Sequence, residues 1–479
     1  MLKPWFTDEG WRMSAVPYLE GTLAFVCIVH VFETYLDYRQ HKKLHETTLP
    51  DKLSRAIRHV DEQNQAKPNN DHVQDDNNDH DSNKSSLLAQ TTAKFETSRL
   101  YSLDKSTFKF VHDSFHFVDG LAMLLLGYMP FMWQTSRRVL ASWGYYDPMA
   151  NEIPLSLVFV TLTAARDMLL SLPFDLYATF VVEERHGFNK QSLGLFFLDK
   201  VKSTLLTVAI GFPVLSAVLW IVRWGGDLFV VYVWTFTFVV TLILMTIVPT
   251  WIMPLFNSFN SLESGSLRDA IEALAASVAF PLTKLFVCDG SKRSSHSNAY
   301  LFGFFNNKRI VLFDTLLTQA SNAEVVAVVG HELGHWKLWH TVQNLVVQQV
   351  YIGAMFAVFA RCMHDRDLFA SFGFDSQSVD LPVVISLTLF TSTVWAPVDK
   401  LLQYVVTANT RANEFQADAF AVDLGHGEPL QSALTKISLE NLANMNPDTL
   451  YSAYHYSHPP LVERLAAISK RMQDRRKHE

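Results

Sequence analysis

Seven apolar stretches, each long enough to cross a membrane, constrain the fold more than any other feature of this sequence. A transmembrane helix needs about 20 predominantly apolar residues. The stretches are Val16–Leu36, Val118–Val139, Ile153–Val182, Ser203–Val222, Leu228–Leu255, Val342–Arg361 and Leu381–Val406. Buried helices of a large water-soluble protein are the alternative, but they would account for one or two such stretches rather than for all. We therefore predict a mainly α-helical integral membrane protein with seven spans.

The positions of lysine and arginine predict how these spans are oriented. Basic residues in short loops favour the cytosolic side of a membrane. Two segments are rich in them, and their members are Arg39, Lys42, Lys43, Lys52, Arg55, Arg58, Arg464, Lys470, Arg471, Arg475, Arg476 and Lys477. In a seven-span chain both segments lie on one side, so the C-terminus and the segment between spans five and six should face the cytosol. The N-terminus should be luminal.

The string His331-Glu332-Leu333-Gly334-His335 is the strongest chemical signal in the chain. Residues four apart lie on one face of a helix, so both imidazoles point the same way and can bind one Zn²⁺. The glutamate beside the first histidine can then act as general base on a water molecule. Zinc-dependent peptide hydrolysis is therefore the leading interpretation.

The surroundings of this string predict that it is helical. Ser321 and Glu324 form a capping box directly before an apolar run, and no proline interrupts the chain from Ala323 to Met363. We therefore expect one long helix that carries the two histidines in its first half and crosses the membrane in its second half.

A catalytic zinc usually has three protein ligands and one open position. Glu414 and Asp418, after the seventh stretch, share a face of a predicted helix. Glu414 can complete a His₂Glu site. Asp418 can accept the ring N–H of a ligand histidine, or it can donate a proton to a leaving group. A solvated helix face is the alternative for this acidic pair.

Two further segments offer candidate substrate contacts. A polar stretch leads into a predicted hairpin over Ala299–Phe304 and Arg309–Phe313, and an edge strand there can bind an extended peptide, with Asn298 and Ala299 as the candidates. His458 precedes a double proline and can donate a hydrogen bond to an oxyanion, with Arg464 as its orienter or charge partner. An ordinary hairpin and a structural His-Pro-Pro turn are the alternatives.

The net charge, the cysteines and the remaining composition indicate no further binding or catalytic site. The net charge of −7 comes largely from an Asp/Asn-rich insert, which predicts a disordered loop at about residues 61–90. The three cysteines form no paired zinc motif, and we find no signature of nucleic-acid binding. The expected organisation is spans one to five in residues 1–255, spans six and seven in 341–407, and a zinc protease domain divided between 256–340 and 408–479.

Taken together, these motifs resemble the type I CAAX prenyl proteases, which are membrane zinc metalloproteases. The resemblance covers nearly the whole chain. Besides the His-Glu-x-x-His string, it is carried by Phe32–Leu36, Leu172–Tyr177, Glu184–Asn189, Ser295–Tyr300, Lys308–Leu316, Asn413–Asp418 and Ser457–Pro460.

The resemblance implies a seven-helix membrane barrel around a water-filled chamber, with a gluzincin-like zinc domain that contains a small β-hairpin or sheet. It implies one Zn²⁺ held by His331, His335 and Glu414. It also implies Glu332 as general base, with Asp418 and His458 as supporting catalytic groups.

The same resemblance implies a substrate and a location. Members of the family remove the last three residues from farnesylated Cys-a-a-X proteins, and some also make a second, upstream cut. The expected location is the endoplasmic reticulum membrane, or also the nuclear envelope, with the zinc domain facing the cytosol.

Two other functions compete with this interpretation. A membrane quality-control zinc protease would share the metal site but cut misfolded or translocon-trapped chains. A membrane transporter or scaffold would bind metal without hydrolysis, although a purely structural site has no need of Glu332.

Overall fold

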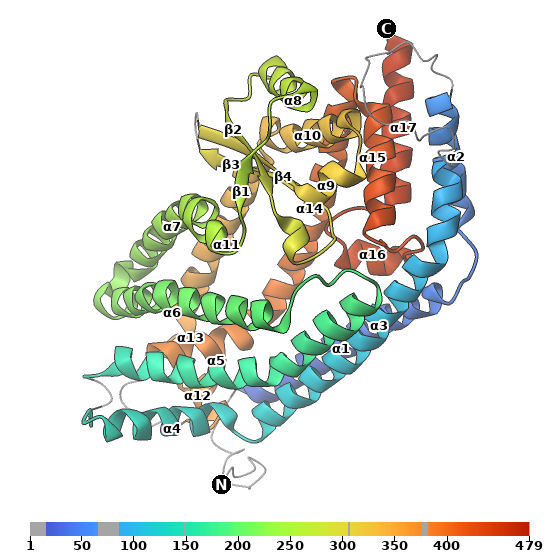
Figure 1. Ribbon diagram of the computed structural model, residues 1–479. Helices are drawn as coiled ribbons and strands as arrows, with labels where there is room; N and C mark the ends of the chain where they lie inside the picture. Colours follow the sequence, from blue (N-terminus) through green and yellow to red (C-terminus); the bar gives the residue numbers. More distant parts are fainter. Residues whose placement is uncertain (1–15, 66–85, 148–149, 305–306, 375–381, 479) are drawn as a thin grey trace.

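The computed structural model describes residues 16–65, 86–147, 150–304, 307–374 and 382–478. Long helices fill the lower part of the molecule, and a smaller body of sheet and helices lies above them (Figure 1). The helices that form or enter this lower part are α1 (Tyr18–Leu44), α3 (Leu87–Leu125), α4 (Tyr128–Ser142), α5 (Glu152–Tyr177) with η1 (Ala178–Glu183), α6 (Leu193–Trp224), α7 (Phe229–Ile247), α11 (His340–Cys362), α13 (Val383–Ser392) and α14 (Ala396–Asp423). Short helical turns η2 (Gly226–Leu228), η3 (Val248–Ile252) and η4 (Met253–Leu255) extend α7 at both ends.

Within the described residues, five helical segments are long and apolar enough to cross a membrane: α1, α5 with η1, α6, α7 with its flanking turns, and α11. Many of their large apolar side chains point outward, for example Leu205 (63% exposed), Trp251 (73%) and Val350 (66%). An apolar surface of this extent is unfavourable in water. In lipid it is favourable, because a helix satisfies its own backbone hydrogen bonds. These segments confirm the prediction of a multi-span α-helical protein.

The predicted count of seven is not matched by seven continuous helices. The second stretch is split between α3 and α4, which meet at 71°, and Gly127 between them has a left-handed φ of 67°. The seventh stretch is the short helix α13 followed by the start of α14. Pro397 lies in the first turn of α14, where its missing N–H is tolerated, whereas a continuous helix would place it in the interior.

The Asp/Asn-rich insert is bordered by helices on both sides. α2 (Asp51–Gln65) continues into the first residues of the predicted loop, and α3 starts before its predicted end. The Asp61 carboxylate accepts the backbone N–H groups of Leu87 (2.9 Å) and Leu88 (3.0 Å), so it caps α3 from across the insert. The remaining part of the predicted loop, residues 66–85, lies outside the described residues.

The upper body contains a four-stranded sheet in the order β1 (Phe259–Ser261), β2 (Leu282–Cys288), β4 (Asn307–Phe313) and β3 (Ala299–Phe304). β2 and β4 run parallel, and the other two pairs are antiparallel. Alternating and β-branched residues put Leu285, Ile310 and Leu312 in a buried core beneath the sheet. The antiparallel β3–β4 pair confirms the predicted hairpin and makes β3 an edge strand.

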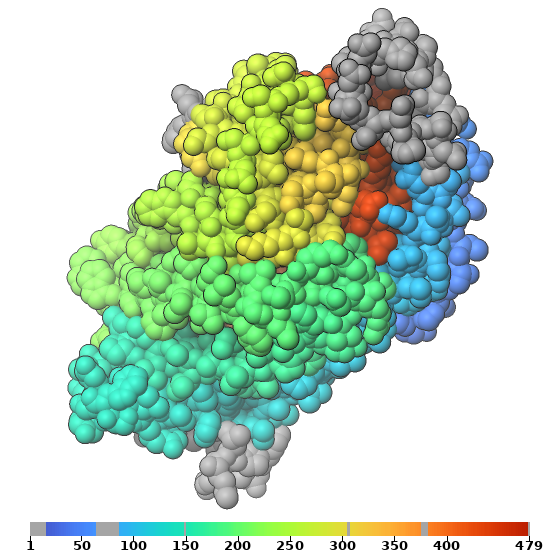
Figure 2. Space-filling model, in the orientation of Figure 1, coloured from blue at the N-terminus to red at the C-terminus, as the bar shows by residue number. Residues whose placement is uncertain are grey.

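Helices pack around this sheet and join it to the C-terminal segment. They are α8 (Ser266–Ser277), α9 (Asp314–Gln319), α10 (Asn322–Lys337), α15 (Gly427–Glu440), α16 (Thr449–His455) and α17 (Leu461–His478), with the single turn η5 (Gly290–Lys292). The short helix α12 (Arg366–Ser371) lies instead among the membrane helices. The space-filling view shows the sheet body seated directly on the green membrane helices (Figure 2).

The prediction of one long helix through the zinc motif is wrong. α10 starts with the predicted capping box of Ser321 and Glu324, but it ends at Lys337, and a separate helix α11 starts at His340. The break is at Trp339, whose φ of 62° is left-handed. No proline or glycine marks this position, so the local sequence gives no signal of the break.

Candidate metal centre

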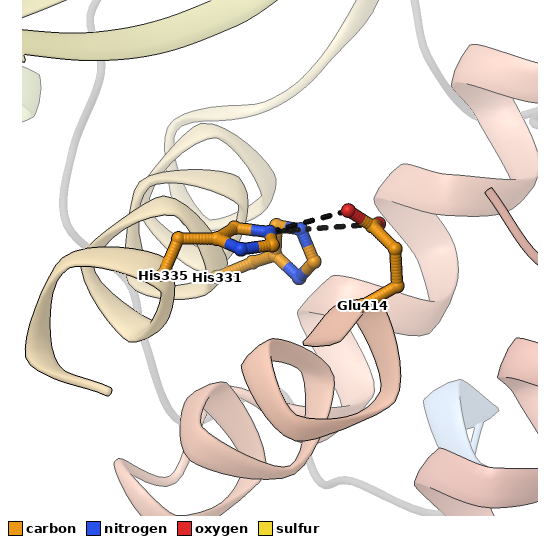
Figure 3. A group of neighbouring side chains, drawn as sticks. All are labelled: His331, His335 and Glu414. Carbon is orange, nitrogen blue, oxygen red and sulfur yellow. Dashed lines mark hydrogen bonds and ion pairs between the residues drawn. The ribbon is translucent and has the colours of Figure 1, made fainter. Parts of the chain in front are cut away.

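The two histidines of the motif come from α10 and the third candidate ligand comes from α14 (Figure 3). Gly334 explains how these helices approach each other. A Cβ atom at this position would lie 3.0 Å from Ala417 Cα and 3.2 Å from its carbonyl oxygen. Because glycine has no Cβ, the α14 backbone can lie directly against α10, and Glu414, one turn before Ala417, reaches the imidazoles.

The donor atoms of the three side chains have nearly the spacing that a tetrahedral metal requires. Nε2 of His331 and Nε2 of His335 are 3.2 Å apart. In the Glu414 carboxylate, Oε2 lies 3.6 Å from the first of these nitrogens and Oε1 lies 3.3 Å from the second. Zn–N and Zn–O bonds of about 2.0–2.1 Å put tetrahedral ligand atoms about 3.3–3.4 Å apart. The residues present therefore fit a divalent metal of the zinc type.

Asp418 lies one turn after Glu414 and contacts the first histidine from behind. Its Oδ1 is 2.8 Å from Nδ1 of His331, which leaves Nε2 of that ring free for the metal. Arg464 of α17 donates two hydrogen bonds to the same carboxylate, at 2.6 and 2.8 Å. Burial alone would raise the pKa of Asp418, but these bonds and that of His331 hold it below its ordinary value.

The acidic pair on α14 is not a solvated helix face. Glu414 and Asp418 are 3% and 1% exposed. Arg464, predicted as a substrate contact and as a partner of His458, is directed at Asp418 and approaches Glu414 to 3.6 Å. Its observed contacts therefore hold Asp418 and the candidate metal ligand Glu414 in place.

Glu332 follows the first histidine on α10, and its side chain is half-buried in the same site. Burial raises the pKa of its carboxyl above the ordinary value, although the neighbouring His331, His335 and Arg464 act in the opposite direction. A carboxylate with a raised pKa is a better proton acceptor, which is the property that a general base needs.

His458 lies in the turn between α16 and α17, and its side chain is 68% exposed. Its Nδ1 is 2.9 Å from the Glu414 carboxylate, so the structure brings it to the candidate metal ligands. This hydrogen bond raises the pKa of His458 and favours the protonated ring, which is a hydrogen-bond donor.

Asn298 and Ala299 lie where the polar stretch enters β3. Ala299 pairs with Leu312 of β4 and is buried, while Asn298 is exposed and its side-chain oxygen accepts the N–H of Ala299 at 2.8 Å. β3 is an edge strand, and it packs beside α10, the helix that carries the zinc motif. Any substrate contact of Ala299 would therefore use its main chain.

The residues that hold the segment just before β3 in place were not predicted from the sequence. His296 stacks on Phe188 with ring centroids 4.1 Å apart, and its Nε2 lies 3.5 Å from Glu183 of η1. Asn441 accepts the backbone N–H of Ser297 at 3.1 Å. The three partners come from distant parts of the chain, so no local pattern relates them to Asn298.

This arrangement defines a class of protein before any relative is considered. A largely buried His₂Glu donor set with a second glutamate beside the first histidine, in a chain with several helices that can cross a membrane, is typical of a membrane-embedded metallopeptidase. Family models agree with this class. Residues 40–258 match the CAAX prenyl protease N-terminal region with five membrane helices, and residues 261–472 match peptidase family M48.

Individual relatives are similar along nearly the whole chain. Proteins named CAAX prenyl protease 1 homolog from Arabidopsis thaliana and Homo sapiens are 46% and 40% identical. These matches cover 95% and 96% of this chain, and 98% and 97% of the relatives. The crystal structure of S. mikatae Ste24p superposes with a TM-score of 0.81 at 36% identity, covering 95% of this chain and 99% of that one. The chain belongs to peptidase family M48, with the N-terminal membrane region of the CAAX prenyl proteases.

Proposed function

We propose that this chain is a zinc metalloendopeptidase that removes the C-terminal three residues from prenylated, in particular farnesylated, Cys-a-a-X proteins. The observation that carries the proposal is the near-tetrahedral spacing of the donor atoms of His331, His335 and Glu414 beside the half-buried Glu332. The names and the full-length similarity of the relatives supply the substrate class.

Each residue of the site has a role in this reaction. Zn²⁺ bound by the two histidines and Glu414 would polarise the scissile carbonyl and lower the pKa of water. Glu332 takes the proton of the attacking water and delivers it to the leaving nitrogen. His458 donates a hydrogen bond to the developing oxyanion, and Asp418 keeps the Nδ1 proton on His331.

The substrate peptide would lie extended along the outer side of β3. Main-chain groups around Asn298 and Ala299 would pair with it as an additional strand, which holds the scissile bond beside the metal and Glu332. Arg464 acts indirectly, because it neutralises and orients Asp418 behind the first ligand.

The protein would work in the endoplasmic reticulum membrane with the metal centre on the cytosolic side. The basic residues at the end of α1 and in α2, together with the basic helix α17, support the cytosolic orientation, and the similarity to the CAAX prenyl proteases supports the location. Both basic segments lie at the same end of the molecule as the sheet body (Figure 1).

The test is cleavage of a farnesylated Cys-a-a-X peptide by the purified, detergent-solubilised protein. Release of the terminal tripeptide that stops with a zinc chelator and is absent in Glu332→Gln is the expected result. An unprenylated peptide of the same sequence is the matched control. Equal cleavage of both peptides would favour a quality-control protease, and zinc binding without cleavage of either would favour a non-catalytic membrane protein.

A further inference from the structure

The second candidate ligand, His335, has a ring partner that the reaction described above does not use. His340 is the first residue of α11 and is 4% exposed. Its Nδ1 lies 3.0 Å from Nδ1 of His335, and its Nε2 lies 3.3 Å from Oε1 of Gln416 on α14. A buried imidazole thus has both ring nitrogens within reach of polar partners, and one of these partners is a metal ligand.

A continuous helix would not bring these two histidines together. Residues five apart on an α-helix are separated by about 140° around the axis, so they lie on different faces. Trp339 separates them with φ 62° and ψ 23°, a left-handed conformation that is unusual for a residue other than glycine. This turn ends α10 and directs His340 back onto His335. Backbone strain of this kind is typical of functional positions.

The hydrogen-bond chemistry allows a single consistent assignment of protons. Nε2 of His335 faces His331 and Glu414, so metal binding requires its lone pair there and leaves the proton on Nδ1. That proton can be donated only if Nδ1 of His340 is an acceptor. The proton of His340 is then on Nε2, where it is donated to the Gln416 side-chain oxygen.

We propose that His340, placed by the left-handed turn at Trp339 and fixed by Gln416, is a positioning residue that selects the metal-binding tautomer of His335. In this proposal His340 accepts the Nδ1 proton of His335, just as Asp418 accepts the Nδ1 proton of His331. The inference rests on the proposed metal site, but it concerns how the second ligand is held rather than which substrate is cut.

Two variants of similar shape separate hydrogen bonding from packing. His340→Asn keeps an oxygen near the position of Nδ1, whereas His340→Leu has nearly the same shape and no acceptor. Zinc affinity is measured for the full-length protein by competition with a chelator, and unfolding of the metal-free protein checks the fold. We expect the Leu variant to lose about tenfold or more in zinc affinity and the Asn variant to remain within about threefold of the wild type.

Equal zinc affinities of His340→Leu and His340→Asn, whether both normal or both reduced, would overturn the inference while leaving the proposed function intact. A wild-type protein that binds no zinc would overturn both. Trp339→Gly tests the turn, since glycine adopts this φ without strain. It should retain the wild-type affinity, and a loss as large as that of His340→Leu would contradict the role of the turn.

Discussion

At the scale of single residues, His331 and His335 are four positions apart on one helix, yet their Nδ1 atoms meet different partners. Asp418 lies behind the first ring and His340 behind the second. Asp418 also brings a charge, which Arg464 balances in a buried bidentate pair. The two ligands therefore depend on different kinds of support, and substitutions behind them should have different consequences.

Replacing Glu332 by glutamine tests the assignment of the base. The variant should bind zinc as the wild type does, because Glu332 is not one of the converging donor atoms. Its kcat should fall by about 10²-fold or more, since no group of comparable basicity replaces it. Metal analysis and peptide cleavage on the same preparation measure both properties. Normal turnover by this variant would refute the role of Glu332.

Asp418→Ala should affect both stability and metal binding. The change leaves Arg464 buried without its carboxylate, which costs about 3–5 kcal/mol, and it lowers zinc affinity by about 10–100-fold. The double variant Asp418→Ala with Arg464→Met should regain much of the stability without regaining zinc affinity. Thermal unfolding and chelator competition distinguish the two effects, and recovery of both in the double variant would contradict this account.

Much of the site could be predicted from the sequence at this scale. The His-Glu-x-x-His spacing predicts two ligands and a base, Glu414 and Asp418 are candidates for a third ligand and its neighbour, and the structure brings these side chains together. His340 could not be found in this way. Its spacing from His335 places it on another face of any continuous helix, so its role depends on a backbone turn that the sequence does not announce.

At the scale of elements, the close packing of α10 on α14 builds the candidate metal centre. Gly334 permits this contact, and it is one of the two unspecified positions in the zinc motif. The capping box at the start of α10 was predictable because it is local. The approach of α14 was not, because it depends on the space beside a residue far away in the chain.

Gly334→Ala should push α14 away from α10. Its Cβ would meet the Ala417 backbone at 3.0 Å, closer than atoms normally pack, so we expect zinc affinity to fall by about tenfold and stability to fall by about 1–3 kcal/mol. Gly330→Ala on the same helix is the matched control, since its Cβ would have no neighbour closer than 3.8 Å. Equal effects of the two substitutions would show that the contact is not limiting.

The start of α10 should be sensitive to acid. The Glu324 carboxylate accepts hydrogen bonds from Ser432 at 2.6 Å, Lys436 at 2.8 Å and the backbone of Ser321 at 2.8 Å. Burial alone would raise the pKa of Glu324, but Lys436 and the other donors hold it below its ordinary value. The stability that this carboxylate contributes is therefore fully present at pH values above the pKa of a glutamate in the unfolded chain, about 4.3. It is lost as the pH falls below that value.

Comparison with Glu324→Gln measures this contribution. In metal-free protein at pH 7, the variant should be less stable by about 2 kcal/mol, since it loses hydrogen bonds to a charged group. The difference in melting temperature should narrow as the pH falls below the unfolded pKa. A difference that stays constant down to acid pH would contradict the role of the ionised carboxylate.

At the scale of the whole molecule, the membrane bundle and the sheet body are connected by more than chain continuity. α2 and the first part of α3 pack against α15 and α17 through a buried cluster that includes Leu53, Phe95 and Leu465. The apolar stretches predicted the spans, because lipid demands long apolar helices. The apolar stretches could not predict how α2 and the start of α3 pack, because these segments are polar and contact elements that are distant in the sequence.

The orientation in the membrane can be tested with single cysteines, after replacement of the three native ones. Lys477→Cys in α17 and Tyr146→Cys in the loop after α4 are at exposed positions, 73% and 79% exposed. In sealed microsomes, a membrane-impermeant maleimide should label the first directly and the second only after permeabilisation. The reverse pattern would place the metal centre on the luminal side.

The most direct test of the central claim is to titrate zinc back into metal-free protein and follow release of the tripeptide from a farnesylated Cys-a-a-X peptide. Activity should rise linearly and reach its maximum at one zinc per chain, and Glu414→Ala should recover no activity over the same range. Full activity without zinc, or normal recovery by Glu414→Ala, would contradict a metal centre built from His331, His335 and Glu414.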